Sequence, residues 1–170
     1  MWHYGRAVAY AAKGDLASAE REQRAFSAGA GAVPRETPLG ILNTAGVVFD
    51  IAAAVLDARL AAARGDRSAA IARWKNAVDA QDRLYYDEPP AWYYPTRESL
   101  GAALLLNDQA AAAELVFRKD LEVNPGNGRS LFGLWRSLDA QHKSGEAATA
   151  KQQFEAAWKT ADVVLTLEEL

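Results

Sequence analysis

Apolar residues recur every three or four positions along most of this chain, which is the spacing that places them on one face of an α-helix. Turn-forming residues interrupt the pattern at Gly14-Asp15, Gly65-Asp66, Asp108 and Ser144-Gly145. Glycine suits the left-handed position that ends a helix, and aspartate caps the start of the next one, so Asp15 and Asp108 are predicted caps. The pattern predicts an all-α chain with a single domain over 1–170, built from helical hairpins at about 2–28, 44–86, 95–123 and 129–161.

Two segments do not follow the helical pattern. Residues 28–43 are rich in Gly, Ala and Pro and are predicted to form a linker. Residues 87–94 contain Pro89 and Pro90, which lack backbone donors and disfavour helical geometry in the residue before each. Pro95 suits the first turn of a new helix, so the segment 87–94 is predicted to be a loop between two helices.

This loop carries Trp92, Tyr93 and Tyr94 in a row, and three aromatic side chains hold a large apolar area. One interpretation is that they pack between neighbouring hairpins. The other is that they form an aromatic patch that faces a ligand. The first is favoured, because exposed aromatic clusters are unusual unless they are functional.

Five residues of the third hairpin fall in register with a 34-residue unit: Leu100 and Gly101 at positions 7 and 8, Ala113 at 20, Phe117 at 24 and Pro125 at 32. Small residues let two helices approach closely, Leu and Phe fill the space beside the contact, and proline ends the second helix. This pattern resembles the tetratricopeptide repeat. The resemblance implies an α-solenoid of right-handed superhelical stacking and a binding role, and it brings no catalytic residues.

The repeat lengths are irregular, since the markers Gly14, Gly65, Asp108 and Gly145 are separated by 51, 43 and 37 residues. From about Ala53 to the end, the chain resembles the C-terminal part of longer bacterial tetratricopeptide proteins. The uncapped start at Met1-Trp2 is expected for a fragment of a longer repeat protein or for a chain cut between repeats.

Composition narrows the function classes. The 37 alanines among 170 residues favour closely packed helices. A net charge of −3 argues against a nucleic-acid-binding surface. The absence of cysteine excludes a disulfide framework, a thiol nucleophile and a zinc ribbon. No apolar run reaches the roughly 18 residues of a membrane span and no signal peptide is visible, so a cytoplasmic protein without membrane contact is predicted.

The sequence offers no catalytic set. His3 and His142 lie in different repeats without a second histidine nearby, so no metal site is predicted. No nucleophile motif or phosphate loop is present, and Asp87, Glu88 and Glu98 have no reason to converge. We therefore predict a non-enzymatic protein with no cofactor.

The resemblance also indicates binding residues, because the first helix of each tetratricopeptide hairpin lines the concave face. Of the residues this implies, Arg59 and Glu98 carry charge, and each serves either a ligand or an ion pair within the protein. The motif positions, together with the aromatic loop, point to Tyr4, Arg59, Trp92, Tyr93, Glu98, Leu105, Ser130 and Leu134.

Two hypotheses follow for the function. The first is a protein-interaction scaffold that holds a peptide or partner segment in the concave face. A groove filled by the chain's own tail would count against it. The second is a structural or oligomerising module, or a regulatory segment of a larger protein, in which a homodimer buries the solenoid end at Trp2.

Overall fold

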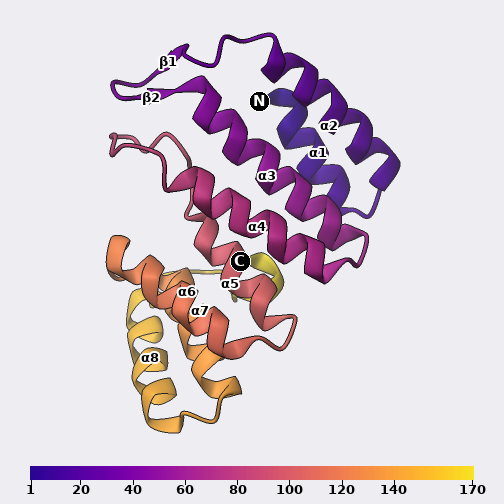
Figure 1. Ribbon diagram of the computed structural model, residues 1–170. Coiled ribbons are helices and arrows are strands. Elements are labelled where there is room, and N and C mark those ends of the chain that lie inside the picture. The colour runs from indigo at the N-terminus through magenta and orange to yellow at the C-terminus, as the bar shows by residue number, and fades with distance from the viewer. The chain divides into compact units, whose positions relative to one another are not determined.

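The computed structural model describes residues 1–170, and the chain divides into two compact units, Met1–Thr96 and Arg97–Leu170. It is mostly helical, and its α-helices pack as sequential neighbours, which confirms the prediction of consecutive helical pairs (Figure 1). The first unit contains α1 (Trp2–Ala12), α2 (Leu16–Gly31), α3 (Ala45–Ala63) and α4 (Arg67–Gln81). The second contains α5 (Thr96–Leu105), α6 (Ala110–Val123), α7 (Gly128–Ala140), α8 (Ser144–Ala157) and a 3₁₀ turn at Leu167–Glu169.

The same backbone turn joins the two helices of every pair. A residue with left-handed geometry ends the first helix, and the N–H of the next residue donates to a carbonyl five positions earlier. The left-handed residues are Gly14, Gly65, Asp108 and His142, with φ of 74°, 79°, 57° and 59°. The bonds run from Asp15 to Tyr10, Asp66 to Ala61, Gln109 to Leu104 and Lys143 to Leu138. All four helical hairpins therefore share the same turn geometry between their two helices.

The predicted cap of α2 is confirmed, because the Asp15 carboxylate accepts a hydrogen bond from Ser18 N at 3.0 Å. Two other turn predictions were wrong. Asp108 is the left-handed residue and Gln109 is the N-cap of α6, while Ser144-Gly145 lies inside α8. The reason is that Asp and His also enter the left-handed region more readily than most residues, so glycine does not mark every turn.

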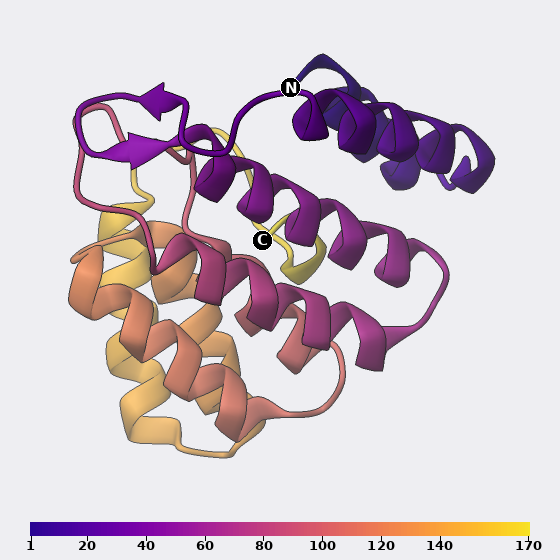
Figure 2. The same ribbon diagram turned by 45° about the horizontal axis from the view of Figure 1, so that its top comes forward.

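The segment predicted as a linker contains a short hairpin. After α2 the chain forms β1 (Pro38–Leu39) and β2 (Asn43–Thr44), which pair antiparallel. The loop after α4 lies beside this hairpin in both Figures 1 and 2. The buried Asn43 side chain joins them, since its amide donates to Tyr85 O at 3.0 Å and accepts from Tyr85 N at 2.9 Å.

The core of the first unit is built around α3. This helix packs against α1, α2 and α4, and it is buried on more than one side because apolar residues cover most of its circumference. Its fully buried residues are Ile51, Ala52, Val55, Leu56 and Ala58.

The core of the second unit is centred on Phe117 of α6, which is fully buried. Its ring lies against the backbone of Gly101 in α5 and of Gly133 in α7, where an added Cβ would come within 3.0 Å of ring atoms. Glycine at both positions therefore allows one aromatic ring to fill the space between two helices.

Candidate functional site

Four aromatic residues of the first unit gather into what we term the aromatic cluster: Tyr4 from α1, and Trp92, Tyr93 and Tyr94 from the loop after α4. Trp92 is only 3% exposed, and its ring lies 5.8 Å from that of Tyr4 in an edge-to-face arrangement. Tyr93 is 68% exposed, while its hydroxyl is 3.2 Å from the Tyr4 hydroxyl. Trp92 therefore packs inward, as the favoured interpretation expected, whereas Tyr93 faces solvent.

Hydrogen bonds fix the loop at both ends. Near its start, Asp87 accepts from Ile41 N of the β-hairpin at 3.2 Å. At its end, the Gln81 side chain donates to Tyr94 O at 3.0 Å and accepts from Thr96 N at 2.7 Å. The exposed Tyr93 is therefore carried by a segment tied to the hairpin and to α4.

Arg59 of α3 contributes a cation beside this cluster. Its guanidinium lies over the Trp74 ring of α4, 5.6 Å from the ring centroid. Arg59 is partly buried, and its Nε has no hydrogen-bond partner. Burial and the Tyr93 hydroxyl raise the pKa of Tyr4 well above its usual range, and the nearby Arg59 charge lowers it only in part. The Tyr4 hydroxyl therefore stays neutral at physiological pH.

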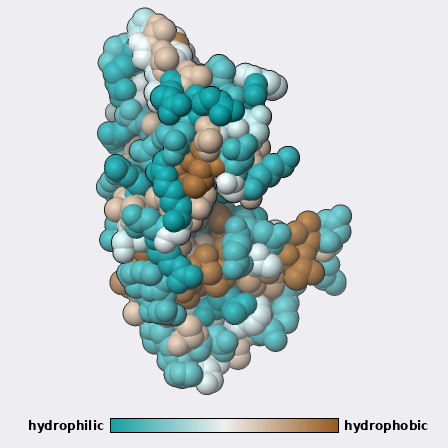
Figure 3. All heavy atoms as spheres, turned by 90° about the vertical axis from the view of Figure 1, so that its right-hand side faces the viewer, coloured by the Kyte–Doolittle hydropathy of each residue, from teal (hydrophilic) through white to brown (hydrophobic).

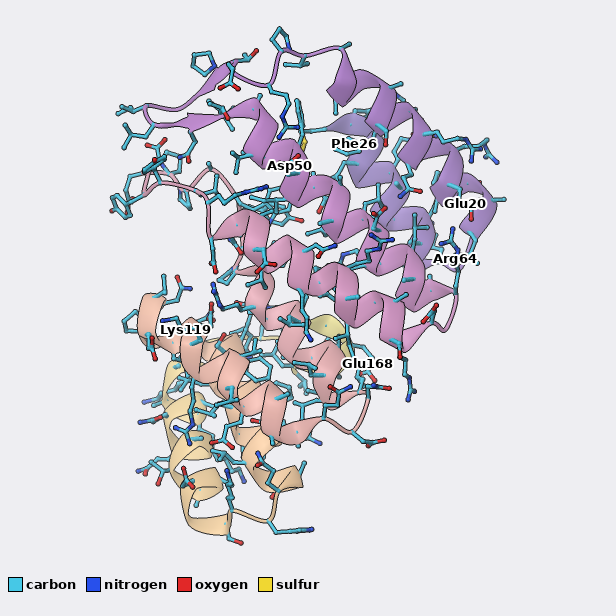
Figure 4. The ribbon with its side chains drawn as sticks, in the orientation of Figure 1. Glu20, Phe26, Asp50, Arg64, Lys119 and Glu168 are labelled. Atoms are coloured by element: carbon cyan, nitrogen blue, oxygen red, sulfur yellow. The ribbon has the colours of Figure 1, made fainter.

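Most other arginines of the first unit form ion pairs or are exposed to solvent. Arg64 pairs with Glu20 at 2.6 Å, and these two side chains point toward each other in Figure 4. Arg35 and Arg83 both pair with Asp50 at 2.8 Å. Arg24, Arg67 and Arg73 are exposed and can be hydrated. Arg59 differs because it is partly buried and forms no ion pair.

The same lack of a partner occurs at Trp92, whose buried Nε1 donor has no acceptor. Buried donors of this kind are rare in folded proteins, and each costs about 1–3 kcal/mol. Both Arg59 and Trp92 lie near Tyr4, since the Trp92 ring is 5.8 Å from the Tyr4 ring and the Arg59 charge acts on the Tyr4 hydroxyl. Two N–H donors in this part of the first unit therefore lack an acceptor.

A separate polar cleft of about 300 Å³ opens among α2, α3 and α4. Several of its polar lining residues already have partners, since Gln23 donates to Asp57 at 2.6 Å and Arg64 pairs with Glu20, which lies outside the lining. Burial raises the pKa of Asp57, and Arg73 together with the Gln23 bond opposes this shift. None of the residues predicted to bind a ligand lines the cleft.

The predicted site residues of the second unit serve its own structure. Glu98 is 2% exposed and accepts from Arg129 Nε at 2.6 Å and from Asn127 at 2.8 Å. Burial raises the pKa of Glu98, and these two bonds oppose the shift. Ser130 is fully buried and donates to Asp120 at 2.5 Å. Leu105 of α5 is partly buried, and Leu134 of α7 is buried.

Sequence reasoning missed Asp120, which is buried and accepts hydrogen bonds from Asn124, Asn127 and Ser130. The signal was present, since Asp120 lies on the apolar side of α6 three residues after Phe117. Together with Glu98 it forms a buried network of two carboxylates that Asn127 bridges.

The chain's own tail uses donors on α5 and α7, the helices that were expected to face a ligand. Ser99 donates to Leu170 O at 2.7 Å, and Arg129 donates to Glu169 O. Leu165 and Leu170 are buried. This occupancy counts against a peptide groove in the second unit, so the candidate site is the part of the first unit formed by Tyr4, Arg59, Trp74, Trp92 and Tyr93.

Large apolar side chains also reach the surface in separate places, as the face in Figure 3 illustrates. One set lies on the β-hairpin and the adjoining loop, and we term it the hairpin surface. Ile41 is 87% exposed and Tyr86 is 80% exposed. The set consists of Leu39, Ile41, Leu42, Tyr85 and Tyr86.

Comparisons with protein families, with curated proteins and with solved structures found no match for this chain. No helix is both long enough and apolar enough to cross a bilayer. No three His, Asp or Glu side chains gather in a way that could hold a metal ion. The candidate site therefore has to be interpreted from its own geometry.

Proposed function

We propose that this protein is a tetratricopeptide-like interaction scaffold whose first unit binds a segment of a partner protein at Arg59 and the aromatic cluster. The repeated hairpin turn and the close packing of Phe117 on Gly101 support the repeat identity. The observation that carries the binding role is the partly buried Arg59 guanidinium without an ion partner.

The energetic reason is that a buried donor without an acceptor, here Arg59 Nε, destabilises the fold that holds it. Features that break a local rule without compensation within the fold are concentrated at functional sites. Here the compensation would come from a bound segment, with Tyr93 and the edge of the cluster supplying apolar area. Tyr, Trp and Arg are also the residues most enriched at the energetic centres of protein interfaces.

Affinity capture from a bacterial lysate tests this proposal. The wild-type chain is compared with Arg59→Leu and Tyr93→Ser, each checked for folding by circular dichroism. Arg136→Leu is the matched control, because Arg136 also lies over aromatic rings, Trp135 at 5.7 Å and Phe132 at 5.8 Å, but in the second unit.

The expected result is a partner that wild type and Arg136→Leu retain and that both first-unit variants lose. Capture that is identical for all four proteins would show that the aromatic cluster is not the binding site. A partner lost only with Arg136→Leu would place binding in the second unit and contradict the proposal.

A second candidate function, self-association, is favoured by the hairpin surface. Exposed apolar groups that gather in one patch often mark interfaces. Trp2, at the predicted solenoid end, is exposed as well. Sedimentation velocity at rising concentration tests this function: a dimer that Ile41→Ser with Leu42→Ser disrupts would support it, and a monomer throughout would exclude it.

A further inference from the structure

We infer that Arg59 receives a carboxylate from the bound segment, supplied by an aspartate or glutamate side chain of the partner. This inference rests on the proposed function and specifies the chemistry of the ligand. The observation behind it is that the site holds hydrogen-bond donors for which the protein supplies no acceptor.

Two buried donors in the site are unsatisfied, Arg59 Nε and Trp92 Nε1. The Trp74 ring lies against the Arg59 guanidinium with its face, and this contact satisfies none of the guanidinium N–H groups by a hydrogen bond. The Tyr4 and Tyr93 hydroxyls bond to each other, and burial raises the pKa of Tyr4 well above its usual range. A ligand that complements this set must bring oxygen acceptors and negative charge.

The number of cations decides between the common oxyanions. A carboxylate carries one charge and matches the planar fork of one arginine. A phosphate monoester carries about −1.5 to −2 at neutral pH and is typically bound by a cluster of arginines. Here Arg59 supplies the charge and the other donors are neutral indole and hydroxyl groups. The composition of the site therefore favours a carboxylate.

Synthetic peptide libraries test the inference without knowledge of the natural partner. Four libraries of equal length are randomised except at one central position, which is fixed as Glu, Gln, Lys or phosphoserine. Each is passed over the immobilised 170-residue chain as wild type, Arg59→Leu, Tyr93→Ser or Arg136→Leu, and the retained fraction is measured at low and at physiological salt.

The expected result is that wild type and Arg136→Leu retain the Glu library about tenfold more than the Gln library, since a charge-assisted hydrogen bond replaces a neutral one. Arg59→Leu should retain Glu and Gln libraries equally, with the residual binding due to the aromatic cluster.

Three outcomes would overturn the inference. Equal retention of Glu and Gln libraries by wild type, when both are lost with Tyr93→Ser, would contradict the carboxylate and leave peptide binding intact. Preference for phosphoserine over Glu would assign the site to phosphate. Retention of no library by wild type would remove the proposed function along with the inference.

Discussion

The packing of Phe117 between two glycines makes a sharp prediction about the second unit. Replacing Gly133 by Ala adds one methyl group at a point where it would lie within 3.0 Å of three Phe117 ring atoms. The ring cannot retreat, because Gly101 faces it in the same close manner. The substitution therefore tests whether this contact positions α6 against α7.

The magnitude follows from two opposing effects. Ala is favoured over Gly in a helix interior by about 1 kcal/mol. Overpacking a tight core typically costs about 1–3 kcal/mol, and the confined ring argues for the upper end. Gly133→Ala should therefore lower the free energy of unfolding by about 2 kcal/mol. Gly5→Ala is the control, because nothing lies within 4 Å of an added Cβ in α1, and it should gain up to about 1 kcal/mol.

Urea denaturation followed by circular dichroism and tryptophan fluorescence measures both variants. Combining Gly133→Ala with Phe117→Leu completes a double-mutant cycle, since the smaller side chain relieves the clash. The coupling energy should be about 2 kcal/mol in favour of the pair. If Gly133→Ala behaves like Gly5→Ala, or if the cycle shows no coupling, the reasoning about this contact is wrong.

Three further predictions concern partners, protons and turns. Arg59→Leu should leave the free energy of unfolding unchanged or raise it by about 1 kcal/mol, because removal of an unsatisfied donor offsets the lost ring stacking. Arg129→Leu should lower the free energy of unfolding by roughly 2 kcal/mol, because Glu98 then stays buried without its cation. Burial alone would raise the pKa of Glu114, but hydrogen bonds from Lys143, Arg118 and Gln141 lower it to about 2. Its contribution of roughly 3 kcal/mol to the free energy of unfolding is therefore present above the ordinary pKa of 4.5 and is lost as pH falls toward 2. Urea titrations at pH 7 and 3 should show this loss in wild type and not in Glu114→Gln. His142→Gly should raise the free energy of unfolding by about 1 kcal/mol, and Gly65→Ala should lower it by a similar amount. Positions 142 and 65 both have positive φ, which glycine adopts without the strain that a Cβ causes.

Each of these predictions has a contrary result. A large loss of stability in Arg59→Leu would mean that Arg59 is a structural residue. An equal acid loss in wild type and Glu114→Gln would mean that other carboxylates govern the acid range. A destabilised His142→Gly would show that the His142 side chain contributes a contact that outweighs its backbone cost.

Local patterns in the sequence predicted much of the fold. Helical periodicity located the hairpins, and the register of Leu100, Gly101, Ala113 and Phe117 identified a tightly packed helix pair. The short strands at Pro38–Leu39 and Asn43–Thr44 were not predictable, because two-residue strands carry no periodic signal. Their position depends on Asn43 bonding to Tyr85, a pairing across 42 residues that no local pattern reveals.

The candidate site was predictable in part. Tyr4, Arg59, Trp92 and Tyr93 were named as candidate binding residues, although packing was the favoured role of the aromatic loop, and all four lie in the first unit. Glu98 was also predicted as a binding residue, yet it is paired with Arg129, which lies 31 residues later in the sequence. Whether a charged side chain finds a partner depends on tertiary contacts, so sequence alone could not separate Arg59 from Glu98. The Trp74 ring lies against the Arg59 guanidinium, a contact between two helices that no local pattern reveals.

The most direct measurement of the central claim is a ¹H–¹⁵N spectrum of the five tryptophan indoles while a Glu-containing peptide retained by the protein is added. If the carboxylate binds at Arg59, the indole signals of Trp74 and Trp92 shift, with Trp92 Nε1–H moving as it gains an acceptor, and those of Trp135 and Trp158 in the second unit do not. Shifts confined to Trp135 and Trp158 would show that the ligand binds the second unit rather than Arg59 and the aromatic cluster.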